Sequence, residues 1–288
     1  MKENISMFSP AKINLFLEIK NKDRDGLHNL ESLMSFCDFG DLIYVSKSKD
    51  LSLEISGPFS RSLIRKDNII LRTIYMLEKY LNTKIKVNIR LNKNLPIASG
   101  MGGGSSNAAT IIHCIKQLFK INFDKNFNDF LFNLGADVPF CFYRRVAMVE
   151  GKGEKITFYP RKIPEYFVLL VNPNIQISTK RIFQKLKINF RTKKKPENRF
   201  VLEEDFLGYL LKKNNDLEVP AIDQCDEIKF IINELNNNTE SLLSRMTGSG
   251  ATCFALYDKR VKLLEAEKKI KEIKENYWVK TTKLVNII

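Results

Sequence analysis

The sequence is poor in histidine, in tryptophan and in paired cysteine. Its 288 residues include two histidines, one tryptophan and five cysteines, and no two cysteines form a C-x-x-C pair. Two histidines are too few for a multi-histidine metal site, and an odd number of scattered cysteines argues against a disulfide framework or a zinc cluster. We therefore expect a cytoplasmic protein without a protein-held metal cluster.

Long apolar runs are also missing. The chain has no run of about eighteen apolar residues, so we expect no transmembrane helix. Its first residues carry Lys12, Asn14 and Glu18 within their most apolar stretch, which does not fit a signal peptide. With 44% hydrophobic residues, the chain can bury a substantial core in one large or two modest domains.

Negative charge is scarce relative to positive charge. Lysine and arginine number 47 against 33 acidic residues, which gives a formal net charge of +14. A basic surface attracts nucleic acid or a phosphorylated small molecule. The densest basic runs, residues 191–195 and 262–274, are typical of a loop and of a solvated helix face. In the second run, the residues expected to face the protein interior are Leu263, Ala266, Ile270 and Ile273. A basic nucleic-acid-binding module is a remote alternative, because no recognisable binding motif accompanies the charge.

Glycine is concentrated in one segment, residues 96–109. This segment holds a proline, four glycines and three serines, between a strand pattern at residues 84–91 and a helix pattern from Ala108. Glycine lets backbone N–H groups approach an anion, and a helix start favours negative charge. The segment predicts a phosphate-binding loop, with an ordinary flexible loop as the alternative. Ser105 and Ser106 can cap the helix or touch a phosphate or its metal ion.

The loop lacks the signatures of two common nucleotide-binding motifs. A Walker A loop ends in Gly-Lys-Ser/Thr, whereas Ser105 and Ser106 follow the glycines here. A G-x-G-x-x-G fingerprint that starts at Gly100 or Gly102 fails at its last position. The sequence therefore argues against the P-loop and Rossmann classes.

A strand pattern near the N-terminus carries two further candidates. Apolar residues alternate with polar ones over residues 11–19, as in a strand with one core face. Lys12 and Asn14 then point the same way, with Cα atoms about 6.5 to 7 Å apart. They can serve a substrate hydroxyl and phosphate together, and an ordinary exposed face is the alternative.

Two more segments carry candidate chemistry. Residues 128–134 predict a helix that Gly135 ends in a left-handed conformation, and Asp137 follows closely. Asp137 is either a turn former or, beside a lysine such as Lys12, a carboxylate that helps stabilise charge on an attacking alcohol. A second glycine loop at residues 246–252 precedes an apolar run and could close a phosphate site from the other side.

Together these motifs resemble those of the GHMP family of small-molecule kinases. The resemblance rests on residues 9–17, on residues 96–109 with 135–139, and on residues 246–254, in the order and spacing of the family. It implies an α+β fold with a ribosomal-S5-like N-terminal domain over residues 1–155 and a ferredoxin-like C-terminal domain over residues 156–288. The active site would lie in the interdomain cleft, and the last strand could return to the first domain.

The resemblance also implies a reaction and a set of site residues. The reaction is ATP-dependent phosphorylation, with Mg²⁺, of the 2-hydroxyl of a cytidine-diphosphate-linked methylerythritol on the non-mevalonate route to isoprenoids. Asp137 would be the catalytic base and Lys12 its partner. The ATP-binding residues would be Pro96, Ile97, Ala98, Ser99, Gly100, Met101, Gly102, Gly103, Gly104, Ser105 and Ser106, with Asn68 either bordering the base or capping a helix. The substrate-binding residues would be Asn14, His28, Thr179, Phe183, Gly248 and Ser249.

One position departs from the pattern of the family. Leu27 stands where the family usually has an aromatic ring, so we expect cytosine binding to depend more on Phe183 or on apolar packing. Another GHMP kinase that acts on a smaller alcohol is the nearest alternative. The expected partner is a small molecule rather than nucleic acid or a membrane, and the sequence leaves monomer and homodimer both open.

Overall fold

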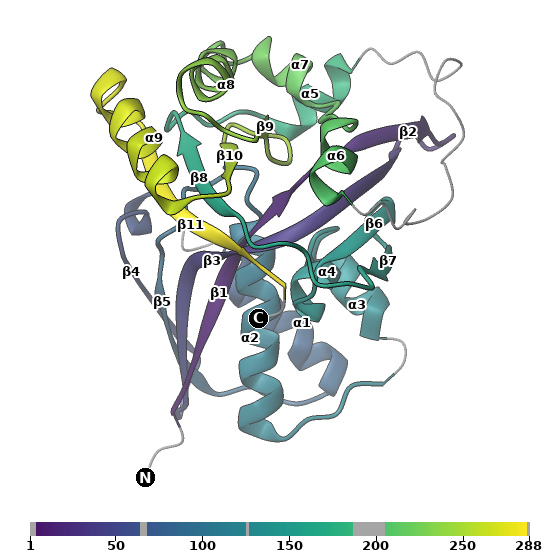
Figure 1. The fold of residues 1–288 in the computed structure, drawn as a ribbon. Helices are drawn as coiled ribbons and strands as arrows, with labels where there is room; N and C mark the ends of the chain where they lie inside the picture. Colours follow the sequence, from purple (N-terminus) through teal and green to yellow (C-terminus); the bar gives the residue numbers. More distant parts are fainter. Residues whose placement is uncertain (1–3, 64–67, 125–126, 187–204, 287–288) are drawn as a thin grey trace. The chain divides into compact units, whose positions relative to one another are not determined.

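The chain crosses between two structural units several times. The computed structural model describes residues 4–63, 68–124, 127–186 and 205–286 (Figure 1), so the basic run at 191–195 lies outside the described residues. The first unit comprises Met1–Lys12, Phe39–Ile97 and Gly102–Arg144, and the second comprises Ile13–Asp38, Ala98–Met101 and Arg145–Ile288. Two strands and the first glycine loop therefore each contribute residues to both units.

The first unit packs helices beside short strands. Its elements are β1 (Asn4–Asn14) up to Lys12, β3 (His28–Lys47) from Phe39 onward, β4 (Ser52–Ser56), a 3-10 turn (Ser60–Ser62), α1 (Ile69–Leu81), β5 (Val87–Asn92), α2 (Gly103–Phe119), α3 (Phe127–Leu134) and α4 (Val138–Tyr143). Strand β5 pairs antiparallel with β3 and parallel with β4. Helix α2 packs against α1 and α4 (Figure 1).

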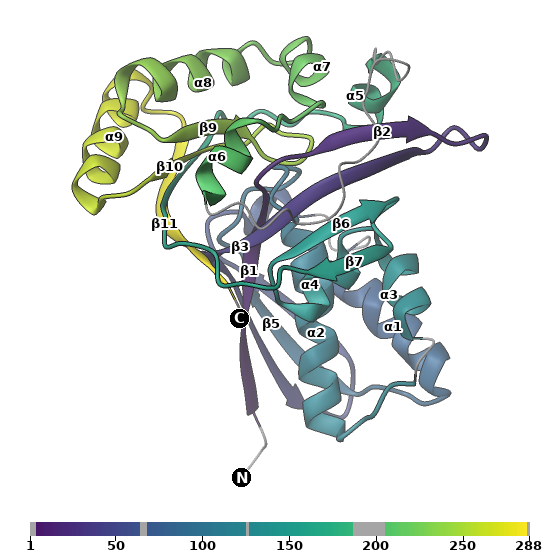
Figure 2. The ribbon, with the colours of Figure 1, turned by 45° about the vertical axis from the view of Figure 1, so that its right-hand side comes forward.

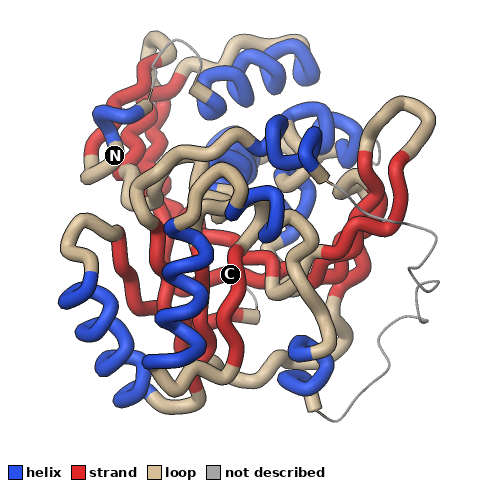
Figure 3. The backbone as a smooth tube through the Cα atoms, turned by 90° about the horizontal axis from the view of Figure 1, so that it is seen from above, coloured by secondary structure: helices blue, strands red, loops and turns tan. Residues whose placement is uncertain are grey.

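The second unit is built on an antiparallel sheet. Its elements are β2 (Glu18–Lys22), β3 up to Asp38, β6 (Ala147–Gly151), β7 (Lys155–Phe158), β8 (Phe167–Asn172), α5 (Thr179–Lys185), α6 (Phe206–Leu211), α7 (Glu218–Ile222), α8 (Glu227–Asn238), β9 (Leu243–Met246), β10 (Cys253–Tyr257), α9 (Arg260–Ile273) and β11 (Trp278–Val285). The strand order is β3-β11-β8-β10-β9, and β2 and β6 also pair with β3. Helices α8 and α9 pack on these strands (Figure 2). Figure 3 separates the helices, in blue, from the strands, in red.

Several local predictions are confirmed. Val87, Ile89 and Leu91 are buried along β5 while the residues between them are not, as the alternation predicts. Helix α2 follows the first glycine loop directly. Helix α9 occupies the basic run and buries Leu263, Ala266 and Ile270. Apart from these predictions, the five cysteines are buried and free, and among the described residues no helix combines the length and apolarity needed to cross a membrane.

Other local predictions are wrong. Ile273, the last residue of α9, is 44% exposed rather than facing inward. Gly135 follows α3 but has no positive φ, and its N–H donates to the carbonyl of Phe132 at 3.1 Å. The strand expected over residues 11–19 is interrupted after Asn14 and resumes at Glu18. The alternative of an ordinary exposed face for Lys12 and Asn14 is also wrong, since they are 3% and 1% exposed.

Candidate functional site

The first glycine loop forms the start of helix α2. Gly102 is the N-cap residue in a left-handed conformation, and no side chain caps the helix. The N–H groups of Gly103, Gly104 and Ser105 fall in the first turn, where an α-helix offers them no acceptor. A Cβ on Gly104 would find its nearest neighbour, Ile69 Cγ2, 3.8 Å away. These amides and the helix dipole suit an anion such as phosphate.

Ser105 and Ser106 lie inside that first turn, so the capping role predicted for them is wrong. Ser106 is buried, and its Oγ lies 3.0 Å from Ser9 Oγ. The Ser9 hydroxyl donates to Asn107 Oδ1 at 2.7 Å. These contacts attach the first turn of α2 to β1.

Lys12 and Asp137 form an ion pair at the same loop. Lys12 Nζ lies 3.0 Å from Asp137 Oδ2, and the two side chains are 4% and 30% exposed. Asp137 occupies the N-cap position of α4, yet its carboxylate accepts no cap hydrogen bond there. The lysine stem passes close to Gly102, where a Cβ would lie 2.6 Å from Lys12 Cγ. Glycine at position 102 thus makes room for the lysine that pairs with Asp137.

A buried ion pair next to the first glycine loop was not predicted from the sequence. The ammonium of Lys93 donates to Asp41, and the two residues are 3% and 0% exposed. The second carboxylate oxygen of Asp41 accepts the N–H groups of Asn94 at 2.7 Å and Leu95 at 2.9 Å. Burial lowers the pKa of Lys93, and Asp41 opposes that shift. Lys93 Nζ lies 3.0 Å from where a Cβ of Gly103 would be, which places positive charge beside the start of α2.

The remaining residues of the first glycine loop differ in their surroundings. Pro96 and Met101 are buried, Ile97 is half-buried, and Ala98 is exposed. Ser99 is buried, and its carbonyl accepts the N–H of Thr252 at 3.3 Å. Asn68 is the N-cap of α1 and accepts the N–H of Ile70 at 2.9 Å, so the capping alternative is confirmed. Contact of Asn68 with a nucleotide base stays a prediction.

The second unit brings the substrate candidates together in pairs. The rings of His28 and Phe183 have centroids 5.3 Å apart at an angle of 33°. Burial, with help from Lys22, lowers the pKa of His28, which favours the neutral imidazole. Thr179 Oγ1 and Ser249 Oγ are 2.7 Å apart. Leu27, in the turn between β2 and β3, is 53% exposed.

Asn14 connects to the second glycine loop through its main chain. Its N–H donates to Thr247 Oγ1 at 2.9 Å, and its side-chain Nδ2 donates to Ser32 Oγ at 2.8 Å. Gly248 approaches Gly100 so closely that a Cβ on Gly248 would lie 2.6 Å from the Gly100 carbonyl oxygen. The structure therefore places Asn14, Gly100 and Gly248 around one short loop.

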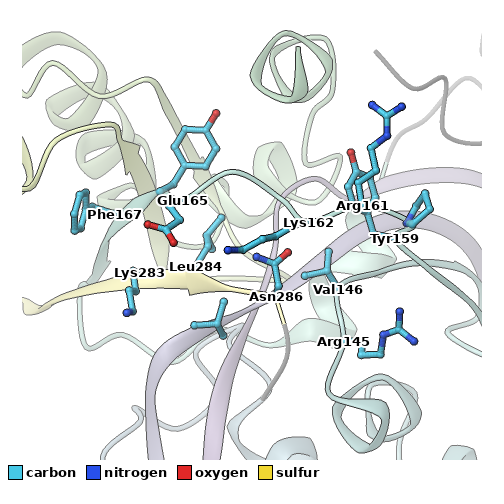
Figure 4. Close-up of a pocket in the computed structure, with 13 residues that line it drawn as sticks. Arg145, Val146, Tyr159, Arg161, Lys162, Glu165, Phe167, Lys283, Leu284 and Asn286 are labelled. Carbon is cyan, nitrogen blue, oxygen red and sulfur yellow. The ribbon is translucent and has the colours of Figure 1, made fainter. Parts of the chain in front are cut away.

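Two pockets of the second unit lie among other residues. One has a volume of about 740 Å³ and is lined in part by Asn215, Glu218 and Arg245. The other, of about 620 Å³, is shown in Figure 4. Its basic side chains, which include Arg161 and Lys162, point in different directions and do not converge on one point. Neither pocket is lined by a residue predicted from the sequence, and within the described ranges no three His, Cys, Asp or Glu side chains are grouped to hold a metal ion.

Comparison with known proteins identifies the family. The family model described as the GHMP kinases N terminal domain matches residues 68–145, and that of the GHMP kinases C terminal domain matches residues 203–276. A 4-diphosphocytidyl-2-C-methyl-D-erythritol kinase of Parvibaculum lavamentivorans is 35% identical over 277 residues, which cover 94% of this chain and 95% of the relative. The chain belongs to the GHMP kinase family.

Further GHMP kinases agree with this assignment. A protein of the same name from Ruegeria pomeroyi is 37% identical over 255 residues, which cover 88% of each chain. The crystal structure of a 4-(cytidine 5'-diphospho)-2C-methyl-D-erythritol kinase matches with a TM-score of 0.77 at 24% identity, over 96% of this chain and 99% of that one. The α+β GHMP kinase fold predicted from the sequence is confirmed.

Proposed function

We propose that this GHMP kinase transfers a phosphoryl group from ATP to the 2-hydroxyl of 4-diphosphocytidyl-2-C-methyl-D-erythritol. The relatives that carry this name are 35% and 37% identical and are covered over most of their length. The observation that carries the proposal is the 3.0 Å pair of Lys12 and Asp137 beside the glycine-rich start of α2. That arrangement combines a carboxylate base, a fixed cation and a set of main-chain amides suited to phosphate.

Each of these groups has a distinct task in the proposed reaction. Asp137 accepts the proton of the acceptor hydroxyl as the oxygen forms its bond to the terminal phosphorus of ATP, and ADP leaves. Lys12 holds the carboxylate in place and stabilises negative charge on the reacting oxygen. The N–H groups of Gly103, Gly104 and Ser105 bind phosphate oxygens of ATP. Catalysis then consists mainly of positioning and charge neutralisation, as is general for phosphoryl transfer.

We propose that residues of the second unit recognise the acceptor. His28 and Phe183 offer adjacent rings to the cytosine, and the neutral imidazole favoured by the lowered pKa of His28 can both donate and accept. Asn14 and the Thr179–Ser249 hydroxyl pair offer polar contacts to the acceptor. With Leu27 in place of a ring, the stacking surface for cytosine comes from Phe183.

Three further points belong to the proposal. Mg²⁺ accompanies ATP and neutralises charge on its phosphates, so a chelator should abolish ADP release. As in the sequence analysis, we place a boundary near Lys155, between the two family-model matches, with an ATP-binding domain at residues 1–155 and a substrate-side domain at residues 156–288. The two structural units differ from this division, because they change at Arg144 and the second also takes in residues 13–38 and 98–101. The protein acts in the cytoplasm on a small-molecule substrate, without nucleic acid or membrane, as a monomer or homodimer.

The test is an ADP-release assay with purified protein, ATP, Mg²⁺ and a panel of alcohols. We expect turnover with the cytidylyl methylerythritol and weak or no turnover with smaller hydroxy acids and amino alcohols. A uridine-linked methylerythritol serves as the matched control for base recognition. Turnover with a smaller alcohol alone would replace this acceptor while keeping the kinase assignment. If none of the alcohols led to ADP release, the kinase assignment itself would be contradicted.

A further inference from the structure

Asn215 uses its whole side-chain amide within a few residues of the second glycine loop. It is 5% exposed and lies just before α7. Its Nδ2 donates to the carbonyls of Met246 at 2.8 Å and Gly248 at 2.9 Å. Its Oδ1 accepts the N–H of Leu217 at 3.0 Å. Both amide hydrogens therefore fix the main chain of the glycine loop, while the oxygen fixes the amide itself.

The loop that Asn215 holds is in contact with several candidate site residues. A Cβ on Gly100 would lie 2.3 Å from the carbonyl oxygen of Thr247, so the two main chains touch directly. Thr247 Oγ1 accepts the N–H of Asn14, and Ser249 Oγ meets Thr179 Oγ1 at 2.7 Å. A shift of the loop would move all of these groups together, because no side chain at Gly100 or Gly248 separates them.

The segment that carries Asn215 is itself held at both sides. The N–H of Leu17 donates to the carbonyl of Asn214 at 2.9 Å, and the N–H of Asp216 donates to that of Leu17 at 2.8 Å. Asp216 Oδ2 accepts the N–H of Ile19 at 2.7 Å. Residues 214–216 thus join the start of β2 to the second glycine loop. These hydrogen bonds fix the main chain that carries Asn215.

Two neighbouring charged side chains add further hydrogen bonds to this region. Glu218 Oε2 accepts the N–H of Met246 at 3.0 Å. Arg245, which is 6% exposed, donates to the carbonyl of Leu15 at 2.6 Å and to that of Leu210 at 3.2 Å. The main chain that leads into the glycine loop is therefore bonded on both its N–H and its carbonyl side.

We propose that Asn215 is a positioning residue for phosphoryl transfer. It holds the second glycine loop, and through that loop the main chains of Asn14 and Gly100, in the geometry that the reaction needs. The inference rests on the proposed kinase function. Because Nδ2 and Oδ1 of Asn215 bond to main-chain groups, we expect it to act through the loop rather than on either substrate, so its removal should lower kcat more than it changes either KM.

The experiment compares two variants at Asn215 with a matched control. Asn215→Asp keeps the shape but removes both donors and faces a carboxylate toward two carbonyls. Asn215→Ser is smaller and retains one donor. The control is Thr239→Val, because Thr239 is also 5% exposed and its Oγ bonds the carbonyl of Leu235 at 2.6 Å and Tyr257 Oη at 2.8 Å, away from both glycine loops. All three are assayed for kcat, both KM values, the thermal midpoint, and hydrogen exchange of peptides over residues 246–252.

We expect kcat to fall about 100-fold in Asn215→Asp, less in Asn215→Ser, and about twofold or less in Thr239→Val at a similar loss of thermal midpoint. Hydrogen exchange over residues 246–252 should rise in the Asn215 variants alone. Unchanged kcat with the midpoint lowered as in the control would overturn the inference and leave Asn215 a purely structural residue. If Asn215→Asp does not fold, the kcat of Asn215→Ser and its hydrogen exchange over residues 246–252 decide the inference by the same criteria.

The two proposals can fail separately. A wild-type protein that turns over while both Asn215 variants match the control contradicts only the positioning role. A wild-type protein that releases no ADP with any alcohol contradicts the proposed function and, with it, any role of Asn215 in phosphoryl transfer.

Discussion

At the start of α2, the first glycine loop carries main-chain N–H groups for which the helix offers no acceptor. The main chain of the second glycine loop, in contrast, is hydrogen-bonded to its neighbours. Around Gly104 a Cβ would meet its nearest atom at 3.8 Å, while at Gly248 it would lie 2.6 Å from the carbonyl oxygen of Gly100. In the second loop, the carbonyls of Met246 and Gly248 accept hydrogen bonds from Asn215. Glycine at position 104 keeps space open, and glycine at position 248 allows two main chains to touch.

This contrast shows that glycine enrichment has two structural meanings in one chain. At the first loop the cations of Lys12 and Lys93 lie beside the helix start, which is the surrounding an anion requires. At the second loop the neighbours are carbonyls, hydroxyls and the amide of Asn215. The charge and the direction of the polar groups around a glycine, rather than the glycine itself, show whether that glycine keeps space open or allows a close packing contact. Substrate binding by Gly248 and Ser249 stays a prediction.

The largest expected effect tests whether the chemistry belongs to the first loop. Asp137→Asn keeps the size of the side chain but removes the base, so we expect kcat to fall by about 10² to 10⁴ while ATP binding changes little. ADP release and equilibrium nucleotide binding measure the two effects. Turnover close to that of wild type would exclude Asp137 as the base.

A pair of alanine substitutions tests the two meanings of glycine directly. Gly248 has a φ of +57°, and a Cβ there meets the Gly100 carbonyl, so Gly248→Ala should lower the free energy of unfolding by about 2 to 4 kcal/mol. Gly104 lies in a helix with open space beside it, where alanine is favoured. Gly104→Ala should therefore keep stability and weaken ATP binding. Urea unfolding measures the stability of both variants, and nucleotide titration measures their ATP affinity. A stability loss in Gly104→Ala together with weakened ATP binding in a stable Gly248→Ala would contradict the comparison.

The pH dependence of stability should carry opposite signs for two half-buried titratable residues, one in each unit. His113 lies in α2, about three turns beyond the first glycine loop. Burial lowers its pKa to about 4 although the Phe142 carbonyl, 2.8 Å from Nε2, opposes the shift. The unfolded state, with a histidine pKa near 6.5, binds the proton more tightly. The free energy of unfolding should thus fall as the pH drops from about 6.5 to 4, by about 3 kcal/mol at most.

His113→Gln keeps a donor for the Phe142 carbonyl and should flatten this acid slope in urea unfolding at stepped pH. Near the second loop, burial raises the pKa of Glu218, although the Met246 N–H and Arg245 oppose the shift. Its favourable contribution is therefore complete below the unfolded pKa and is lost as the pH rises through the folded one. Glu218→Gln should remove that opposite slope, and equal slopes in both variants and wild type would contradict the assignment.

The smallest effect concerns the acceptor side. Leu27 is 53% exposed, next to His28, whose ring meets Phe183. Leu27→Tyr adds a stacking surface, which should lower the KM for the cytidylyl acceptor by a few-fold, or about 1 kcal/mol, without a change in kcat. Leu27→Ile is the matched control without a ring. A KM equal to that of the control would show that position 27 does not contact the base.

Features that depend on neighbours in the sequence could be predicted from the sequence. Alternation over residues 84–91 and glycine before an apolar helix predict β5, the first glycine loop and α2, and the structure contains all three. Predictions failed where a terminal position changes the outcome. Ile273 is exposed at the last position of α9, and the glycine N-cap at Gly102 leaves the following serines inside the helix.

Features that depend on distant partners could not be predicted from local patterns. The pairing of Lys12 with Asp137 follows from the resemblance to GHMP kinases and not from spacing. Nothing near Asn215 in the sequence shows that Met246 and Gly248 lie within hydrogen-bonding distance. Burial of a polar side chain is favourable only with a partner, and here the partner comes from another part of the chain.

Asp41 and Lys93 illustrate what such a distant partnership means for the history of the chain. Replacing either one alone would leave the other charge buried without its partner beside the first glycine loop, at a penalty of about 3 to 5 kcal/mol. A penalty of that size rivals the net stability of many folded domains. Successive single substitutions cannot readily convert the pair to neutral residues, so descendants of this protein should keep both charges or exchange them together.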